Sequence, residues 1–183
     1  ITGSTRALLK GERTALNIVQ HMSGVATATN RCVELVKGTK ASVADTRKTL
    51  PGLRGLQKYA VTVGGGKNHR YNLSDCAMLK DTHDSMTGAV NALREKMGHT
   101  VKIEVEVGNL EELKEALTLG VEIIMLDNMT NEDMAKAVEM TNGKALLEAS
   151  GNVTSETIRA IAETGVDIIS IGAITHSVKA FDI

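Results

Sequence analysis

Residues 101–128, VKIEVEVGNLEELKEALTLGVEIIMLDN, contain one complete strand–helix–strand pattern. Apolar residues alternate with charged ones over 101–107, follow helical spacing over 109–119, and run almost continuously over 121–128. Gly120 stands directly before the second apolar run, where helices commonly end. A strand, a helix and a second strand at this spacing form a βα unit with parallel strands. The stretch therefore predicts a parallel α/β fold.

The same pattern continues on both sides of this stretch. Six short apolar runs occur along the chain, and from the third onward they are spaced by 20 to 23 residues. The runs occupy residues 41–45, 76–81, 101–107, 121–128, 144–151 and 166–173. Six such strands fit an α/β barrel, complete or incomplete, better than an open doubly wound sheet, because no dinucleotide-binding glycine fingerprint follows the first strand.

Residues 4–36 have a helical pattern instead, interrupted by Gly11 and Gly24. These two glycines predict a division into two or three helical segments. We therefore expect a helical lead-in over residues 1–37 and a barrel domain over residues 38–183. The chain begins at Ile1 and ends after AFDI, so we interpret it as a piece of a longer protein.

The composition argues against several classes of function. The 183 residues include no Trp and one Phe, so the core must be aliphatic and aromatic platforms for nucleic-acid bases are not expected. The net charge is −1, yet residues 41–80 carry seven Lys or Arg against two Asp. A basic segment within an acidic domain favours a small anionic ligand over nucleic acid. Two cysteines and no membrane-length apolar run predict a cytoplasmic protein without a membrane partner.

Polar residues gather at the ends of the predicted strands. The carboxyl ends of parallel strands meet at one rim of a barrel, which is where active sites lie in this architecture. We therefore expect a polar mouth that binds an anionic ligand. Its residues are Asp45, Thr46, Arg47, Lys48, Lys80, Asp81, Glu104, Glu106, Asp127, Asn128, Ser150, Gly151 and Gly172.

The third strand carries charges on one face. Lys102, Glu104 and Glu106 share a face by the period of two, and we expect this face to point into the barrel because the apolar face must meet the helices. Buried carboxylates there require cations or a metal as partners. Glu106 and Asp127, at successive strand ends, are placed to share Mg²⁺. The alternative is an edge strand with one solvated face.

Two glycine-containing segments add candidate binding groups. In VGGGKNHRYNLSD (63–75), the glycines give a backbone that approaches a ligand or moves as a flap, and Lys67, His69 and Arg70 complete a cationic pocket. The alternative is a mobile surface loop. Ser150, Gly151 and Gly172 precede helix starts, the first near a Thr154 N-cap, and predict a phosphate cup unless they only form tight turns. We assign no chemistry to the remaining histidines, His21, His83, His99 and His176.

Eight segments together resemble the quinolinate phosphoribosyltransferase family. They are ERTALN (12–17), DTRKTLPGLR (45–54), GGGKNHR (64–70), LKD (79–81), EVEV (104–107), LDN (126–128), EASGN (148–152) and SIGAIT (170–175). The resemblance implies the barrel fold of type II phosphoribosyltransferases without the family's N-terminal α/β domain. It also implies conversion of quinolinate and phosphoribosyl pyrophosphate, with Mg²⁺, into nicotinate mononucleotide, pyrophosphate and CO₂ in NAD biosynthesis. Thr82 departs from the Asn that the family pattern leads us to expect.

The resemblance also implies a role for each site residue. Four cations bind the two quinolinate carboxylates, Lys48 contacts the phosphoribosyl donor and its leaving pyrophosphate, and Lys48, Lys80, Glu106 and Asp127 form the catalytic set. Glu106 and Asp127 face the ribose hydroxyls and Mg²⁺. Arg13 enters the site of the neighbouring subunit, which implies a homodimer. The four quinolinate ligands are Arg47, His69, Arg70 and Lys80, and the 5′-phosphate cup is Ser150, Gly151 and Gly172.

Three alternatives remain open at this point. A phosphoribosyltransferase-like protein associated with molybdenum transport is similar over the TRKT segment (46–49). A barrel aldolase would use Lys80, at a strand end, to form a Schiff base. A non-catalytic interaction module is the third, although a binding surface has no need of inward charged faces.

Overall fold

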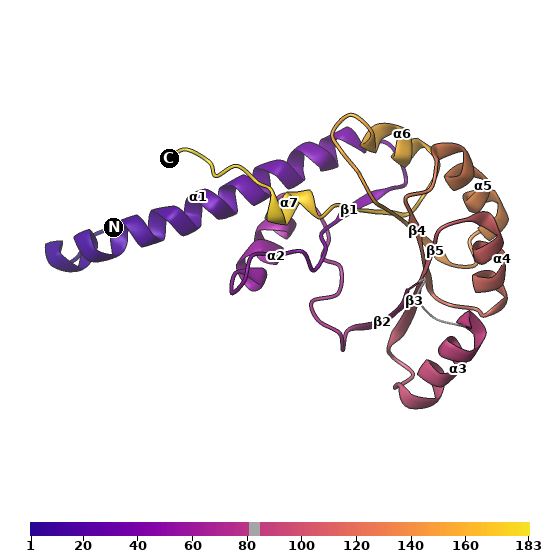
Figure 1. Ribbon diagram of the computed structural model, residues 1–183. Helices are drawn as coiled ribbons and strands as arrows, with labels where there is room; N and C mark the ends of the chain where they lie inside the picture. Colours follow the sequence, from indigo (N-terminus) through magenta and orange to yellow (C-terminus); the bar gives the residue numbers. More distant parts are fainter. Residues whose placement is uncertain (81–84) are drawn as a thin grey trace.

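The computed structural model describes residues 1–80 and 85–183. A long helix, α1 (Thr5–Leu35), precedes six strands that alternate with shorter helices (Figure 1). The strands are β1 (Ser42–Ala44), β2 (Cys76–Leu79), β3 (Lys102–Val107), β4 (Ile123–Asp127), β5 (Leu146–Ser150) and β6 (Ile168–Ser170). The helices that follow them are α2 (Arg54–Val63), α3 (Met86–Lys96), α4 (Leu110–Thr118), α5 (Asn131–Thr141), α6 (Ile158–Glu163) and α7 (Ala173–His176).

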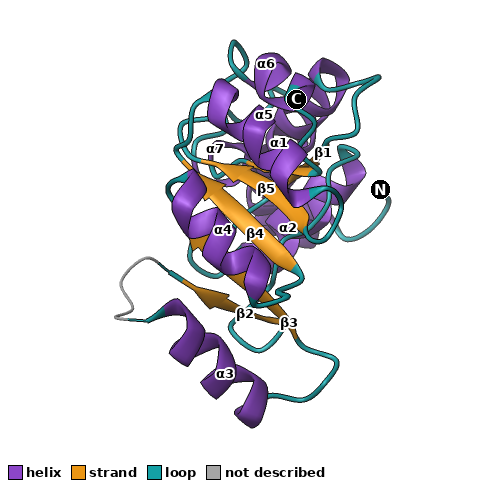
Figure 2. Cartoon of the chain, turned by 90° about the vertical axis from the view of Figure 1, so that its right-hand side faces the viewer, coloured by secondary structure: helices purple, strands orange, loops and turns teal. Residues whose placement is uncertain are grey.

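The six strands form one parallel sheet in the order β1-β6-β5-β4-β3-β2. Helices α3 to α6 line the outer side of the curved sheet, and Figure 2 shows the central strands crossing behind α4. β1 and β2 are the two edges of this sheet, so within the described residues the barrel is open between them. The prediction of a parallel α/β barrel is confirmed, in its incomplete form.

The alternation of residues in β3 separates the core from the barrel interior. Ile103, Val105 and Val107 are at most 4% exposed and belong to the main hydrophobic core together with Leu113 of α4. The helices begin where the sequence supplies caps, as when the Asn109 side chain accepts the backbone N–H groups of residues 111 and 112. The buried apolar face thus fixes which side chains of the strand point inward.

Helix α1 differs from its prediction because it is continuous through both glycines. A glycine inside a helix costs about 1 kcal/mol relative to alanine but does not by itself end the helix. Gly24 is retained for packing, since a Cβ there would overlap the backbone carbonyl of Lys179 in the C-terminal segment. The first half of α1 projects away from the sheet (Figure 1). Among the described residues, no helix combines the length and apolar character needed to cross a membrane.

Candidate active site

A cavity of about 530 Å³ opens at the carboxyl ends of the strands. Eleven of the predicted site residues line it, from the ends of β1 to β5 and the 67–70 segment. They are Thr46, Arg47, Lys48, His69, Arg70, Lys80, Glu106, Asp127, Asn128, Ser150 and Gly151. Gly172 lines an adjoining cavity of about 350 Å³ that shares Lys48, Ser150 and Gly151 with the first. Arg13 is exposed on the projecting half of α1, outside the residues that line either cavity.

The cations form one wall of the larger cavity. Arg47 follows β1 and lies near Arg70 and Arg54. Partial burial is the main cause that lowers the pKa of Arg47, and the positive charges of Arg70 and Arg54 lower it further. Arg70 is anchored, because its guanidinium donates to the carbonyl of Cys76 at 3.0 Å. An anion that enters the cavity would relieve the repulsion among these guanidinium groups.

Asp45 holds this wall in place instead of lining the mouth. It is completely buried, and its Oδ1 accepts a hydrogen bond from Lys58 Nζ and one from the His69 backbone N–H, the latter at 2.8 Å. Burial raises the pKa of Asp45, while the Lys58 ammonium opposes that rise. Backbone hydrogen bonds between β1 and Lys67 complete the attachment. The 67–70 segment is therefore fixed beside the β1 edge.

Two of the three glycines before this segment serve packing, and the third, Gly65, has φ 89°. A Cβ at Gly64 would overlap the carbonyl of Ala26, and a Cβ at Gly66 would lie 2.7 Å from Thr29 Cγ2. Both contacts are with α1, at the point where α2 ends. None of the three glycines lines either cavity, so the expectation that their backbone approaches a ligand there is wrong, and small residues are needed where two helices approach closely.

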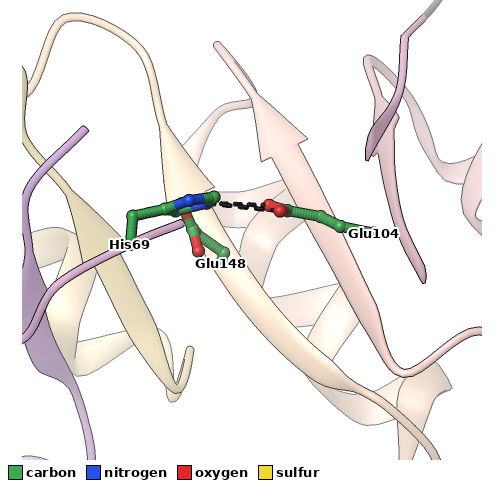
Figure 3. Close-up of side chains that lie close together, drawn as sticks. All are labelled: His69, Glu104 and Glu148. Atoms are coloured by element: carbon green, nitrogen blue, oxygen red, sulfur yellow. Dashed lines mark hydrogen bonds and ion pairs between the residues drawn. The ribbon is translucent and has the colours of Figure 1, made fainter. Parts of the chain in front are cut away.

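The floor of the cavity is a buried cluster of His69, Glu104 and Glu148 (Figure 3). His69 Nε2 lies 3.2 Å from Glu104 Oε2 and 3.3 Å from Glu148 Oε1, and the two glutamates are at most 2% exposed. Burial disfavours the imidazolium, but the hydrogen bonds with both carboxylates outweigh it and raise the pKa of His69 to about 10. Burial also raises the pKa of Glu104.

The geometry of this cluster decides what it can bind. His69 Nδ1 accepts the backbone N–H of Arg70 at 2.8 Å, so the ring hydrogen lies on Nε2, toward the carboxylates. A metal at this cluster would need the lone pair of Nε2, and the hydrogen bond that Nδ1 accepts assigns the ring hydrogen to Nε2. In this arrangement the three residues form the floor of the cavity.

Glu148 is not among the site residues predicted from the sequence. It lies on β5, opposite Met125 of β4, between the buried residues Leu147 and Ala149. A charged residue within an apolar strand was the available signal, as it was for Glu104. The inward direction expected for β3 is confirmed for Glu104 and Glu106, but Lys102 is exposed at the beginning of the strand, where the barrel interior has not yet begun.

Two further carboxylates line the same cavity. Glu106 Oε2 accepts a hydrogen bond from Lys80 Nζ at 2.8 Å, across β3 and β2. Asp127 ends β4, and its Oδ2 accepts a hydrogen bond from Asn128 Nδ2 at 2.9 Å. Carboxylate oxygens are the hard donors that Mg²⁺ prefers. The residues expected next to Lys80, namely Asp81, Thr82 and His83, lie outside the described part of the chain.

Small residues form the other end of the site. Gly151 follows β5 with φ 98°, and Gly172 lies beside the Lys48 side chain at the beginning of α7. Thr154 does not cap α6 as expected. The helix begins at Ile158, and the Thr154 hydroxyl instead accepts the N–H of Glu156 in the preceding turn. His176, to which we assigned no role, also lines the smaller cavity.

Comparison with known proteins places these features in one family. The family model for the C-terminal domain of quinolinate phosphoribosyl transferase matches residues 25–183. A probable nicotinate-nucleotide pyrophosphorylase [carboxylating] of Methanocaldococcus jannaschii is 47% identical, over 98% of this chain and 68% of the relative. A nicotinate-nucleotide pyrophosphorylase [carboxylating] of Mycobacterium leprae is 48% identical, over 100% of this chain and 66% of the relative.

Solved structures agree with this comparison. NadC from Streptococcus pyogenes superimposes with a TM-score of 0.94 at 45% identity, over 98% of this chain and 65% of that one. The nicotinate-nucleotide pyrophosphorylase from Francisella tularensis gives a TM-score of 0.92 at 47% identity, over 97% and 64% of the two chains. This chain therefore spans about two thirds of the length of the relatives it matches.

Proposed function

We propose that this chain, which belongs to the quinolinate phosphoribosyltransferase family, provides the catalytic barrel of an enzyme that joins quinolinate to phosphoribosyl pyrophosphate. The products are nicotinate mononucleotide, pyrophosphate and CO₂, a step of NAD biosynthesis. The observation that carries the proposal is one cavity in which four Lys or Arg side chains, the Glu106 and Asp127 carboxylates and two residues of the small-residue cup converge. Each group matches one part of the two substrates.

Quinolinate is a planar dicarboxylate, and the cationic wall is suited to it. Arg47, Arg70 and Lys80 line the cavity with donors that can bind two carboxylate groups, and the guanidinium groups can do so through paired hydrogen bonds. Both ring nitrogens of His69 are engaged by protein groups. We therefore assign His69 the role of a rigid floor beneath the pyridine ring, with Arg70 attached to it through the backbone.

The chemistry follows from where charge develops. As pyrophosphate leaves, positive charge grows on the anomeric carbon and negative charge on the leaving oxygen. We assign Glu106 and Asp127, which line the cavity, the role of facing the ribose and stabilising the positive charge, and Lys48 the role of stabilising the pyrophosphate. Mg²⁺, held by these two carboxylates and the substrate phosphates, would supply further neutralisation of the leaving group.

Decarboxylation needs no further protein cofactor. Once the ring nitrogen is bonded to the ribose it is positively charged, and it accepts the electron pair left on the neighbouring ring carbon when the bond to CO₂ breaks. A proton then bonds to that carbon. The cationic wall holds the leaving carboxylate in place, and positioning of this kind accounts for a large part of such rate enhancements.

We also propose that the enzyme is a homodimer in which Arg13 enters the partner's cavity. In the isolated chain the first half of α1 exposes a group of large apolar side chains, which a second subunit would cover. Leu8, Leu9, Ile18 and Val19 are 39%, 69%, 39% and 49% exposed. The aldolase alternative loses support, because the Glu106 ion pair occupies the Lys80 amine that would have to attack a carbonyl.

The decisive experiment incubates the full-length protein with quinolinate, phosphoribosyl pyrophosphate and Mg²⁺ and measures released CO₂ together with the ultraviolet absorbance of the mononucleotide. Arg47→Ala should weaken quinolinate binding about 10- to 100-fold, the loss expected for a charged hydrogen bond. Arg94→Ala, an exposed arginine that donates to the Gly120 carbonyl, is the control and should bind normally. Absence of CO₂ with the wild-type protein would refute the function and leave the molybdenum-associated alternative.

A further inference from the structure

Two strained asparagines follow neighbouring strands at the cavity. Among the described residues, the non-glycine positions with positive φ are Asn128 (φ 53°), Asn142 (φ 44°) and Asn152 (φ 49°). Asn142 ends α5, where a left-handed residue is ordinary. Asn128 and Asn152 follow β4 and β5, and both line the cavity. Strained residues persist where the surrounding contacts hold them, and such positions cluster at functional sites.

The side chain of Asn128 connects two parts of the site. Its Nδ2 donates to Asp127 Oδ2 at 2.9 Å, and its Oδ1 accepts from Asn152 Nδ2 at 3.1 Å. This amide orientation is the one that satisfies both partners, because a carboxylate only accepts and Asn152 presents its NH₂ group. Its backbone N–H donates to the Ser150 carbonyl at 2.9 Å. The residue thus bridges the end of β4 to the end of β5.

Gly151 packs closely against the side chain of Asn128. A Cβ at Gly151 would overlap the Asn128 side-chain amide, so the backbone of the cup rests directly on Asn128. A group bound by the cup would therefore act on Asn128 through both Gly151 and Asn152. Aspartate at position 128 would repel Asp127, and glycine would lack both hydrogen bonds.

We propose that Asn128 is a positioning residue that couples phosphate binding in the cup of Ser150, Gly151 and Gly172, which Asn152 adjoins, to the orientation of the Asp127 carboxylate. This inference rests on the proposed function, which supplies the 5′-phosphate for the cup and the ribose for Asp127. Binding energy from the non-reacting phosphate is thereby used to align a catalytic group, which raises the rate of reaction instead of only tightening binding.

The test compares two donors, phosphoribosyl pyrophosphate and ribose 1-pyrophosphate, which lacks the 5′-phosphate, in the full-length protein. Asn128→Gly keeps the positive φ without strain and removes both hydrogen bonds. Its kcat with the phosphorylated donor should fall about 10- to 100-fold, the loss expected for a hydrogen bond to a charged group. With the truncated donor, the change should be less than about threefold, because that donor leaves the cup empty.

Two variants complete the design. Asn152→Gly removes the hydrogen bond between Asn152 and Asn128 but keeps the one between Asn128 and Asp127. It should therefore also reduce the ratio of kcat with the phosphorylated donor to kcat with the truncated donor. Asn142→Gly makes the same change at the exposed end of α5 and should behave as the wild type with both donors. Quinolinate affinity, measured in every variant, should stay within about twofold of the wild-type value, because the cationic wall is untouched.

Three results would contradict the proposed coupling. Equal losses of kcat for both donors in Asn128→Gly would overturn the coupling and leave only local orientation of Asp127. An unchanged donor preference in Asn152→Gly would overturn it as well. If the wild-type protein used neither donor, the proposed function would be wrong and the coupling would fall with it. Asn128→Asp provides a second variant of the same shape if the glycine variant does not fold.

Discussion

The proton held beneath the cavity is a property of three residues acting together. Hydrogen bonds with Glu104 and Glu148, working against burial, raise the pKa of His69 to about 10. Because Nδ1 accepts the Arg70 amide and Nε2 carries the hydrogen of the ring, the additional proton held at neutral pH lies on the two carboxylates that face Nε2. The folded chain therefore binds one more proton here than the unfolded chain does above pH 6.5.

This difference makes stability depend on pH. The contribution is fully present below the unfolded value of 6.5 and is lost as pH rises toward about 10, so the free energy of unfolding should fall by up to about 1.4 kcal/mol per pH unit. Urea unfolding between pH 6.5 and 8.5 measures this slope. His69→Gln should flatten it, and His99→Gln, at an exposed position, should not. Identical slopes for wild type and His69→Gln would contradict the prediction.

The buried pair of Asp45 and Lys58 should dominate local stability. Their side chains are 0% and 3% exposed, so removing one partner leaves a charge buried alone. Lys58→Met should lower the free energy of unfolding by about 3–5 kcal/mol. Lys37→Met removes the exposed partner of Glu34 and should change it by less than about 1 kcal/mol. Chemical denaturation measures the free energy of unfolding of both variants. Similar decreases in the two variants would argue against the role given to Asp45.

The sequence identified most charged residues of the site but not the direction of each side chain. Glu106 and Asp127 lie at the ends of β3 and β4, and Arg47 and Lys80 follow β1 and β2, where the barrel rule places them at one rim. Asp45 has the same local signal and turns into the core, because Lys58 on α2 pairs with it. That pairing depends on tertiary contacts between segments, and spacing along the chain does not contain it.

At the scale of elements, the positions of the strands were easier to predict than the structural roles of the glycines. The βα repeat follows from the periodicity of the apolar residues, and all six predicted runs contain the observed strands. Gly24, Gly64 and Gly66 were interpreted as breaks or as a flap, yet each lies where another backbone or side chain approaches. Local sequence cannot distinguish a glycine required for flexibility from one required for close packing.

Helix α1 provides a direct test of that distinction. At Gly11 a Cβ would meet nothing within 4 Å, so Gly11→Ala should stabilise the protein by about 0.5–1 kcal/mol through helix propensity. At Gly24 the Cβ would overlap the Lys179 carbonyl, so Gly24→Ala should destabilise it by about 1–3 kcal/mol. Thermal unfolding of the two variants measures the opposite signs. An increase in stability in both variants would mean that the C-terminal segment does not pack on α1.

At the scale of the whole molecule, two surfaces of the described chain are not covered by other parts of the same chain. The sheet is open between β1 and β2, and the first half of α1 projects with exposed apolar side chains. Arg13 lies on that projecting half, outside the residues that line the cavity. A second subunit that covers α1 would explain both the exposed side chains and the position of Arg13.

Mixing two inactive variants tests this arrangement. If Arg13 acts in the partner's cavity, a dimer of one Arg13→Ala chain and one Arg47→Ala chain has one site with both arginines and one site with neither. Random association in a two-fold dimer makes half of the dimers mixed, so the mixture should recover about a quarter of the wild-type activity. Turnover is measured after the full-length variants are unfolded and refolded together, with each variant refolded alone as the control. If Arg13 served its own chain's cavity, every site in a mixed dimer would lack one arginine and the mixture would stay as inactive as its components.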